Sequence, residues 1–302
     1  MAVIEVRDLH KRYGDKVAVE DVSFTVERGE IFGILGPNGA GKTTTVECLE
    51  GIRVPDRGTV SVLGLDPQRD KAEVRQRLGV QLQESQLPDK LRVGEALELY
   101  SSFYRNPADP EKLLTTLGLA DKRDTGYKKL SGGQKQRLSI ALALIGSPEV
   151  AVLDELTTGL DPQARRDTWD LIETVRDQGV TVLLVTHFME EAERLCDRIA
   201  VIDAGRVVAV DTPHGLVAGV DDEQRVRFRP SGPIDDELLR ALPAVRRVER
   251  HGGQVIVTGG GNVVAAVTSL LARNHVIAGE LRVEQANLDD AFVALTGRKL
   301  EN

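Results

Sequence analysis

The chain has little cysteine, no long apolar run and no excess of positive charge, and each absence excludes a class of protein. Its 302 residues include only two cysteines, Cys48 and Cys196, and neither has another Cys or a His nearby at metal-ligand spacing. A disulfide framework and a zinc site are therefore excluded. Both thiols are expected to be small buried apolar groups in a reducing compartment.

Apolar stretches are short throughout the chain. The most apolar segments, 139–145 and 180–185, are far shorter than the roughly 20 residues that span a bilayer. The first residues, MAVIEVRDLHKRYG, alternate apolar and polar side chains like a strand and lack the apolar centre and cleavage site of a secretion signal. We therefore expect a cytosolic protein that reaches a membrane only through another chain.

Acidic residues outnumber basic ones by 47 to 39, which gives a formal net charge of −8. A field of this sign repels polyanions, so we expect no nucleic acid as a bulk partner. The hydrophobic content of 41% is ordinary for a globular protein, and the length suits one large domain and one small domain. The sequence has no internal repeat and no low-complexity tract.

A glycine-rich segment, GPNGAGKTT, is the first motif with a definite chemistry. It fits the pattern Gly-x4-Gly-Lys-[Ser/Thr] and lies between an apolar strand pattern at 31–35 and a helical one, the context that a phosphate loop requires. Glycines let successive backbone N–H groups surround phosphates, Lys42 neutralises their terminal oxygens, and Thr43 offers a hydroxyl to Mg²⁺. The predicted nucleotide-binding residues are Gly36, Pro37, Asn38, Gly39, Ala40, Gly41, Lys42, Thr43 and Thr44.

A second glycine turn, LSGGQ at 130–134, opens another helical pattern. Amides at a helix N-terminus form an anion site, so Ser131, Gly132, Gly133 and Gln134 are predicted to face a phosphate as well. One chain thus has two segments that can each bind a phosphate group. This pair of motifs resembles the signature of ATP-binding cassette (ABC) ATPases, in which two cassettes pack head to tail and each ATP lies between the phosphate loop of one copy and the LSGGQ helix of the other.

The closing segment NLDDAFVALTGR resembles the tail of ABC ATPases of the daunorubicin-resistance type, which have an extra C-terminal domain of about this length. The resemblance implies a homodimer that hydrolyses ATP with Mg²⁺. It also implies a separate transmembrane permease of the ABC-2 exporter type. The chain is then expected at the cytoplasmic face of the cell membrane, held there by the permease, with hydrophobic drugs or lipids as cargo.

Two carboxylates end the apolar run VAVLDE at 150–155, at the strand end where α/β sheets place their ligands. We expect Asp154 to hold a water of the Mg²⁺ shell and Glu155 to activate the attacking water as a general base. His187 ends the next strand pattern, VTVLLVT, and matches the switch histidine of the family, which contacts the γ-phosphate. The other four histidines are interpreted as structural.

Further site residues come from the resemblance alone. Gln83 matches the Q-loop glutamine, a Mg²⁺ ligand that links the site to the helical subdomain, although Gln81 lies two residues away and competes for the role. Asp161 matches the D-loop, which crosses the dimer. Tyr13 is placed to stack on adenine, or is an ordinary half-exposed tyrosine. Leu156 stands where the family has Pro, so we expect a less rigid turn there.

The predicted fold class is α/β, a P-loop NTPase cassette over 1–219 with a helical subdomain at about 85–145. Strand patterns at 3–6, 17–26 and 31–35 precede a helical pattern that runs from about 71 to 120, and a hairpin at 198–211 closes the cassette. The accessory domain at 220–302 is α+β. Its order of patterns, β-α-β-β-α-β, predicts the split βαβ arrangement of ferredoxin-like domains.

The function predicted from these features is the ATPase of an exporter. Two alternatives stay open, namely the ATPase of an importer and a regulatory ATPase whose C-terminal domain senses a ligand. The resemblance also implies a groove beside the Q-loop, lined by residues around 84–105, that receives short cytosolic helices of the permease. The apolar stripe at 93–104 either belongs to that groove or is only core. Trp169 is interpreted as packing.

Overall fold

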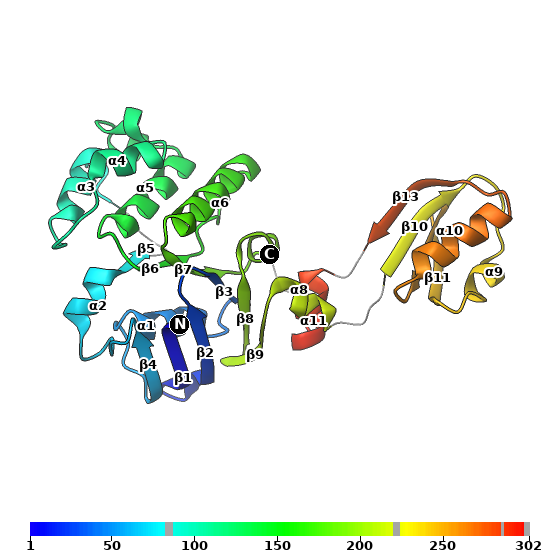
Figure 1. Cartoon of the computed structure of the whole chain (residues 1–302), viewed down its shortest axis with the longest axis horizontal. Helices are drawn as coiled ribbons and strands as arrows, with labels where there is room; N and C mark the ends of the chain where they lie inside the picture. The colour runs from blue at the N-terminus through cyan, green and yellow to red at the C-terminus, as the bar shows by residue number, and fades with distance from the viewer. Residues whose placement is uncertain (82–86, 220–223, 285–286, 299–302) are drawn as a thin grey trace. The chain divides into compact units, whose positions relative to one another are not determined.

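The computed structural model describes residues 1–81, 87–219, 224–284 and 287–298 (Figure 1). These residues form two compact units, Met1–Pro213 and a second that begins at His214. No helix of the described segments is long and apolar enough to cross a membrane.

A six-stranded sheet forms the centre of the first unit, in the order β5-β6-β7-β3-β8-β9. The first five strands in this order are parallel, and β9 is antiparallel to β8. β3, β6 and β7 are buried along their whole length, as expected for apolar strands that are covered on both faces. The strands are β3 Ile31–Leu35, β5 Leu78–Gln81, β6 Val150–Asp154, β7 Thr181–Thr186, β8 Arg198–Asp203 and β9 Arg206–Asp211.

This sheet places three functional segments at one edge. In the register of β3 with β7, Leu35 lies opposite Thr186, and in that of β6 with β7, Asp154 lies opposite Val185. The glycine loop, the two carboxylates and His187 follow these strand ends, so the parallel pairing brings them together. The predicted hairpin at 198–211 is confirmed as β8 and β9.

A three-stranded antiparallel sheet, β2-β1-β4, packs against the central sheet. Its strands are β1 Ala2–Tyr13, β2 Lys16–Glu27 and β4 Arg57–Val62, and the rings of Phe24 on β2 and Phe32 on β3 stack with centroids 5.3 Å apart. The prediction of a first strand at 3–6 only was wrong, because β1 continues past an irregularity at Asp8, where φ is 49°. Such a bulge breaks the alternation of side chains.

Helices cover the central sheet and build a separate helical part (Figure 1). The helical pattern at 71–120 was predicted too long, because the short strand β5 interrupts it. The helices of the first unit are α1 Lys42–Leu49, α2 Lys71–Arg77, α3 Val93–Ser101, α4 Pro110–Thr116, α5 Gly132–Leu144, α6 Pro162–Asp177 and α7 Met189–Leu195, with 3-10 turns at Ala120–Lys122 and Tyr127–Lys129.

The second unit contains a four-stranded antiparallel sheet in the order β11-β12-β10-β13. Counted from the first strand of this sheet, the order is 2-3-1-4, and the predicted split βαβ arrangement is therefore confirmed. Apolar residues of β10 and β12 pack with one face of α10. The elements are α8 Pro213–Ala218, β10 Gln224–Pro230, α9 Asp236–Arg240, β11 Val245–His251, β12 Gln254–Gly259, α10 Val263–Arg273, β13 Ala278–Glu284 and α11 Leu288–Thr296.

Candidate functional site

The glycine loop joins β3 to α1 in a conformation that two of its glycines require. Gly41 precedes the first residue of α1 with φ at 102°, a region that other residues rarely adopt. A Cβ atom on Gly41 would overlap the carbonyl oxygen of Ala18, and one on Gly36 would overlap that of Ile202. The backbone therefore passes close to neighbouring strands at these two positions.

Lys42 lies at the centre of this loop and is only 5% exposed. Its Nζ donates to the carbonyl oxygens of Gly36 at 2.8 Å and Pro37 at 3.2 Å. Burial lowers the pKa of Lys42, while the nearby carboxylates of Glu155 and Asp154 oppose that shift. The loop carbonyls thus hold a buried cation next to the two acids that follow β6.

Asp154 and Glu155 differ in their surroundings. Asp154 is 7% exposed, and burial raises its pKa to about 6, with Glu155 adding to the shift and Lys42 opposing it. Glu155 has φ at 49°, which is uncommon for a residue with a side chain, and its backbone N–H donates to the carbonyl oxygen of Val185 at 2.9 Å. The turn that presents Glu155 is held in an unfavourable conformation by its neighbours, a feature that clusters at functional sites.

Glu155 and His187 face each other across two adjacent strands. Nδ1 of His187 lies 3.2 Å from Oε1 of Glu155, and the two side chains are 14% and 11% exposed. The ring of Phe188 packs beside the imidazole with centroids 4.1 Å apart. A carboxylate oriented by a histidine, next to a phosphate loop, is an arrangement that can position and deprotonate a water molecule.

A hollow of about 310 Å³ unites most of the predicted nucleotide contacts. Tyr13, at the end of β1 and 39% exposed, lies at this hollow, as the adenine role requires. Two residues of β2, Lys16 and Ala18, were not predicted. The lining consists of Tyr13, Lys16, Ala18, Asn38, Gly39, Gly41, Lys42, Thr43, Thr44 and Glu155.

The LSGGQ segment lies at a different hollow, of about 500 Å³. Ser131 caps α5 by a reciprocal pair of bonds, in which its Oγ accepts from the N–H of Gln134 and its own N–H donates to Oε1 of Gln134. Asp161 caps α6 by accepting from two backbone N–H groups, and these bonds lower its pKa. Ser131, Gly132, Gly133, Gln134 and Asp161 all line this hollow, which shares no residue with the phosphate hollow.

The structure describes only one of the two candidates for the Q-loop glutamine. Gln83 lies outside the described residues, so its role stays a prediction. Gln81, its competitor, is the last residue of β5 and is 5% exposed. Its Oε1 accepts from the backbone N–H of Asp154 at 3.1 Å, which holds the end of β5 against the end of β6.

Glu191 on α7 is a buried acid that the sequence reasoning missed. Trp169 donates from Nε1 to Oε1 of Glu191 at 3.0 Å, so this tryptophan forms a hydrogen bond in addition to the packing predicted for it. Burial raises the pKa of Glu191, while the neighbouring side chains of Thr186, Trp169 and Thr157 oppose the shift. The bond from Trp169 joins α6 to α7. The need of a buried indole N–H for an acceptor was the available signal.

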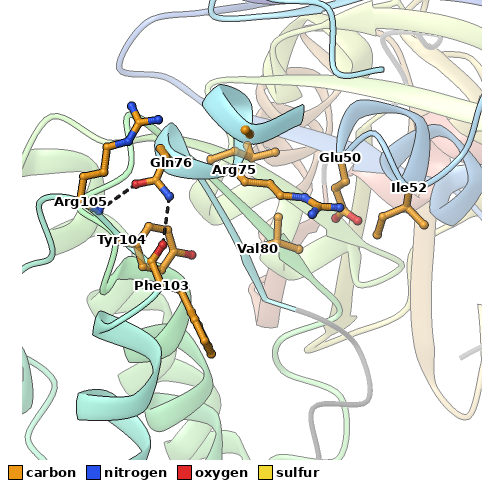
Figure 2. A pocket seen from close by; sticks show the side chains of 10 residues that line it. Glu50, Ile52, Arg75, Gln76, Val80, Phe103, Tyr104 and Arg105 are labelled. Atoms are coloured by element: carbon orange, nitrogen blue, oxygen red, sulfur yellow. Dashed lines mark hydrogen bonds between the residues drawn. The ribbon is translucent and has the colours of Figure 1, made fainter. Parts of the chain in front are cut away.

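A third hollow, of about 470 Å³, lies between the end of α1, helix α2 and the segment that follows α3 (Figure 2). Of the residues around 84–105 that were predicted to line a groove, 103–105 line this hollow, and 84–86 lie outside the described residues. The lining residues are Glu50, Ile52, Ala72, Arg75, Gln76, Leu78, Val80, Phe103, Tyr104 and Arg105. The apolar stripe at 93–104 divides between the two alternatives, because Leu97 is fully buried whereas Phe103 is 63% exposed.

Glu50 is the most unusual residue of this hollow. It is 8% exposed, and burial raises its pKa from 4.5 to about 7, with the charges of Asp154 and Glu47 adding to the shift. Gln76 orders the opposite wall by accepting from the N–H of Arg105 at 2.9 Å and donating to the carbonyl oxygen of Phe103 at 3.0 Å.

We expect Glu50→Gln to stabilise the chain above neutral pH and to have little effect at pH near 5. The folded-state pKa lies above the unfolded value, so the cost of burying the ionised carboxyl is absent below about pH 4.5, grows up to about pH 7 and is then constant. The gain at pH near 8 should be about 3 kcal/mol. Thermal unfolding at both pH values measures it, with Glu193→Gln, which changes an exposed carboxyl on α7, as the control. A gain of equal size at both pH values would contradict the assignment.

The chain is similar in sequence to known proteins. The ABC transporter family pattern matches residues 19–158. The chain is 40% identical to the Nod factor export ATP-binding protein I of Burkholderia orbicola (strain AU 1054), with 100% of this chain and 99% of that protein covered. It is 38% identical to the protein of the same name from Rhizobium etli (strain ATCC 51251 / DSM 11541 / JCM 21823 / NBRC 15573 / CFN 42), with 100% and 95% covered.

Solved structures give the same result for the fold. The structure of an ATP binding subunit of an ABC transporter matches with a TM-score of 0.65 at 30% identity, covering 72% of this chain and 92% of the other. A dimeric ATP-binding cassette in a post-hydrolysis state, bound to ADP and Pi, matches with a TM-score of 0.62 at 25% identity, covering 69% and 98%.

Proposed function

This chain belongs to the ATP-binding subunits of ABC transporters and is an ATPase, and from that premise we propose that it powers an exporter by closing as a dimer on two ATP molecules. The motion would be passed to a separate ABC-2 type permease, with the chain held at the cytoplasmic face of the membrane. The names of the relatives, which refer to Nod factor export, favour export over import.

The observation that supports a dimer most directly is the separation of the two phosphate-facing hollows. Lys42 and Thr43 line one, whereas Ser131 and Gly133 line the other, and no residue is common to both. A single copy therefore offers each phosphate group only half of its contacts. Two copies related by a twofold axis would complete both sites, because a contact from one copy to the other is then made in return. The dimeric cassette with ADP and Pi among the similar structures supports this proposal.

The residues at the phosphate hollow divide the chemistry among them. Lys42 and the loop amides would bind the β- and γ-phosphates, and Tyr13 would stack on the base. Glu155 would accept a proton from the attacking water, while His187 orients that carboxylate and contacts the γ-phosphate. Loss of the γ-phosphate removes the groups that bridge the copies, so hydrolysis reopens the dimer.

The donor set at the edge of the sheet fits Mg²⁺. The carboxyl of Asp154 is buried and makes no hydrogen bond or ion pair with any described residue, and the Thr43 hydroxyl lines the same hollow as Lys42. These are hard oxygen donors, and a site that also uses substrate phosphates needs only one or two carboxylates. When bound, Mg²⁺ neutralises charge on the β- and γ-phosphates. Thr43 and Asp154 would hold it, Asp154 through water, with Gln83 as the third predicted ligand.

The third hollow is the proposed contact with the permease. It opens beside exposed apolar side chains, of which Ile52 is 54% and Phe103 is 63% exposed, and large exposed apolar groups mark interaction surfaces. An apolar groove of this kind suits an amphipathic helix. The wall formed by α2 continues into β5, whose last residue accepts a hydrogen bond from the backbone of Asp154. A displacement of α2 by a docked helix would therefore be transmitted to the nucleotide site.

Reconstitution with a membrane partner tests the proposed function. We expect the polytopic membrane protein encoded beside this chain to copurify with it from detergent and to change its ATPase rate, with drugs or lipids as the first cargo to test. Replacing Phe103 by Ala should weaken the complex without changing the ATPase rate of the free chain. A complex that also requires a soluble substrate-binding protein would instead show an importer.

A further inference from the structure

We propose that Glu50 recognises a basic side chain on the segment that docks in the third hollow, so that the partner helix presents a Lys or Arg there. This inference rests on the proposed function and adds to it the chemistry of the docked segment. It names one position in the groove and one charge on the partner.

Glu50 is a buried carboxyl in the wall of this hollow, without a partner among the described residues. The residue is 8% exposed and lines the hollow, yet its carboxyl makes no hydrogen bond or ion pair with any residue that the structure describes. A buried carboxyl without a partner is costly, and native proteins rarely keep one. Burial raises the pKa of Glu50, and the nearby negative charges of Asp154 and Glu47 add to the shift. A cation delivered from outside would remove that cost.

The arginines that line the described part of the hollow do not form an ion pair with Glu50. Arg105 pairs with Glu73 at 3.1 Å, so its charge is engaged elsewhere. Figure 2 shows the side chain of Arg75 extending toward Glu50, but the two form no ion pair and Arg75 is exposed. An exposed guanidinium is hydrated and gains little from pairing.

The largely apolar surroundings of Glu50 favour a long basic side chain on an apolar helix face. Ile52 lies on the same side of the hollow as Glu50, and Phe103 and Tyr104 lie on the opposite side (Figure 2). Lys and Arg place an aliphatic stem along apolar surface and a charge at its end. An acidic segment would instead bring like charge toward Glu50, Glu47 and Asp154.

A selection of helical peptides tests this inference on the full chain. A display library of stapled helices of about three turns, with an apolar face and all other positions random, is selected against the wild-type chain and against Glu50→Gln. We expect Lys or Arg to be enriched at one position with the wild type only. Peptides from that selection should bind Glu50→Gln about tenfold more weakly by fluorescence anisotropy, and Glu193→Gln, a control at an exposed carboxyl on α7, with unchanged affinity.

Two further variants assign the binding to this hollow. Binding of the selected peptides should weaken in Phe103→Ala, which marks the groove, and should be unchanged or tighter in Arg75→Gln. The inference is overturned if the selection returns no groove binder, if basic residues are not enriched, or if they are enriched equally with Glu50→Gln. If the membrane protein copurifies but its affinity is indifferent to Glu50→Lys, the inference fails while the proposed function stands. If no membrane protein associates with the chain, the proposed function fails, while the peptide selection still decides the inference.

Discussion

Replacing Glu155 by Gln is expected to lower ATP turnover by about 10²–10⁴-fold while ATP binding is kept. The amide retains the shape of the side chain and an oxygen toward Nδ1 of His187, but it cannot accept the proton of the attacking water. Because Gln meets the same backbone strain at φ 49° as Glu does, folding should be little affected. The variant should therefore bind ATP, close and remain closed.

Three measurements check this result. Steady-state phosphate release gives the turnover, binding of a fluorescent ATP analogue gives the affinity, and size exclusion with ATP and Mg²⁺ should show a dimer that the wild type forms only transiently. Glu193→Gln, which changes an exposed carboxyl on α7, is the control and should match the wild type in all three. A Glu155→Gln chain that stays monomeric and turns ATP over would show that another group is the base.

The sequence was sufficient for the parts of the site that follow strand ends. Apolar runs identified β3, β6 and β7, and parallel pairing then placed Lys42, Asp154 and His187 at one edge. Lys16 and Ala18 could not be assigned in this way, because they reach the phosphate hollow through the packing of the antiparallel sheet on the glycine loop. That contact depends on tertiary structure and leaves no local pattern.

Buried polar residues were the other group that sequence reasoning missed. Glu50 and Glu191 have ordinary neighbours in the sequence, and each is unusual only because of what surrounds it in space. The same limit applies to strands. β4 at Arg57–Val62 has few apolar residues and was not predicted, since its pairing with β1 defines it. The split βαβ unit was predictable because the order of its strand and helix patterns, β-α-β-β-α-β, is typical of that arrangement.

Mixing two inactive variants is expected to restore about a quarter of the wild-type ATPase rate. Lys42→Ala damages the phosphate loop. Ser131→Arg fills the LSGGQ anion site, which in the proposed dimer contacts the ATP held by the other copy. A dimer of either variant alone therefore has two defective sites. Random pairing makes about half of the dimers mixed, and each mixed dimer has one site with an intact loop and an intact signature.

The outcome depends on geometry and not on either residue alone. If both half-sites of one copy served the same ATP, no mixture could combine an intact loop with an intact signature, and the rate would stay at the sum of the two variants. Ser131 also caps α5, so Ser131→Asn, which can still cap, is needed to separate loss of the helix end from loss of the phosphate contact. Equal far-ultraviolet circular dichroism of all variants completes the control. Recovery that rises and falls with the mixing ratio, and is greatest at equal amounts, is the result that only a shared site predicts.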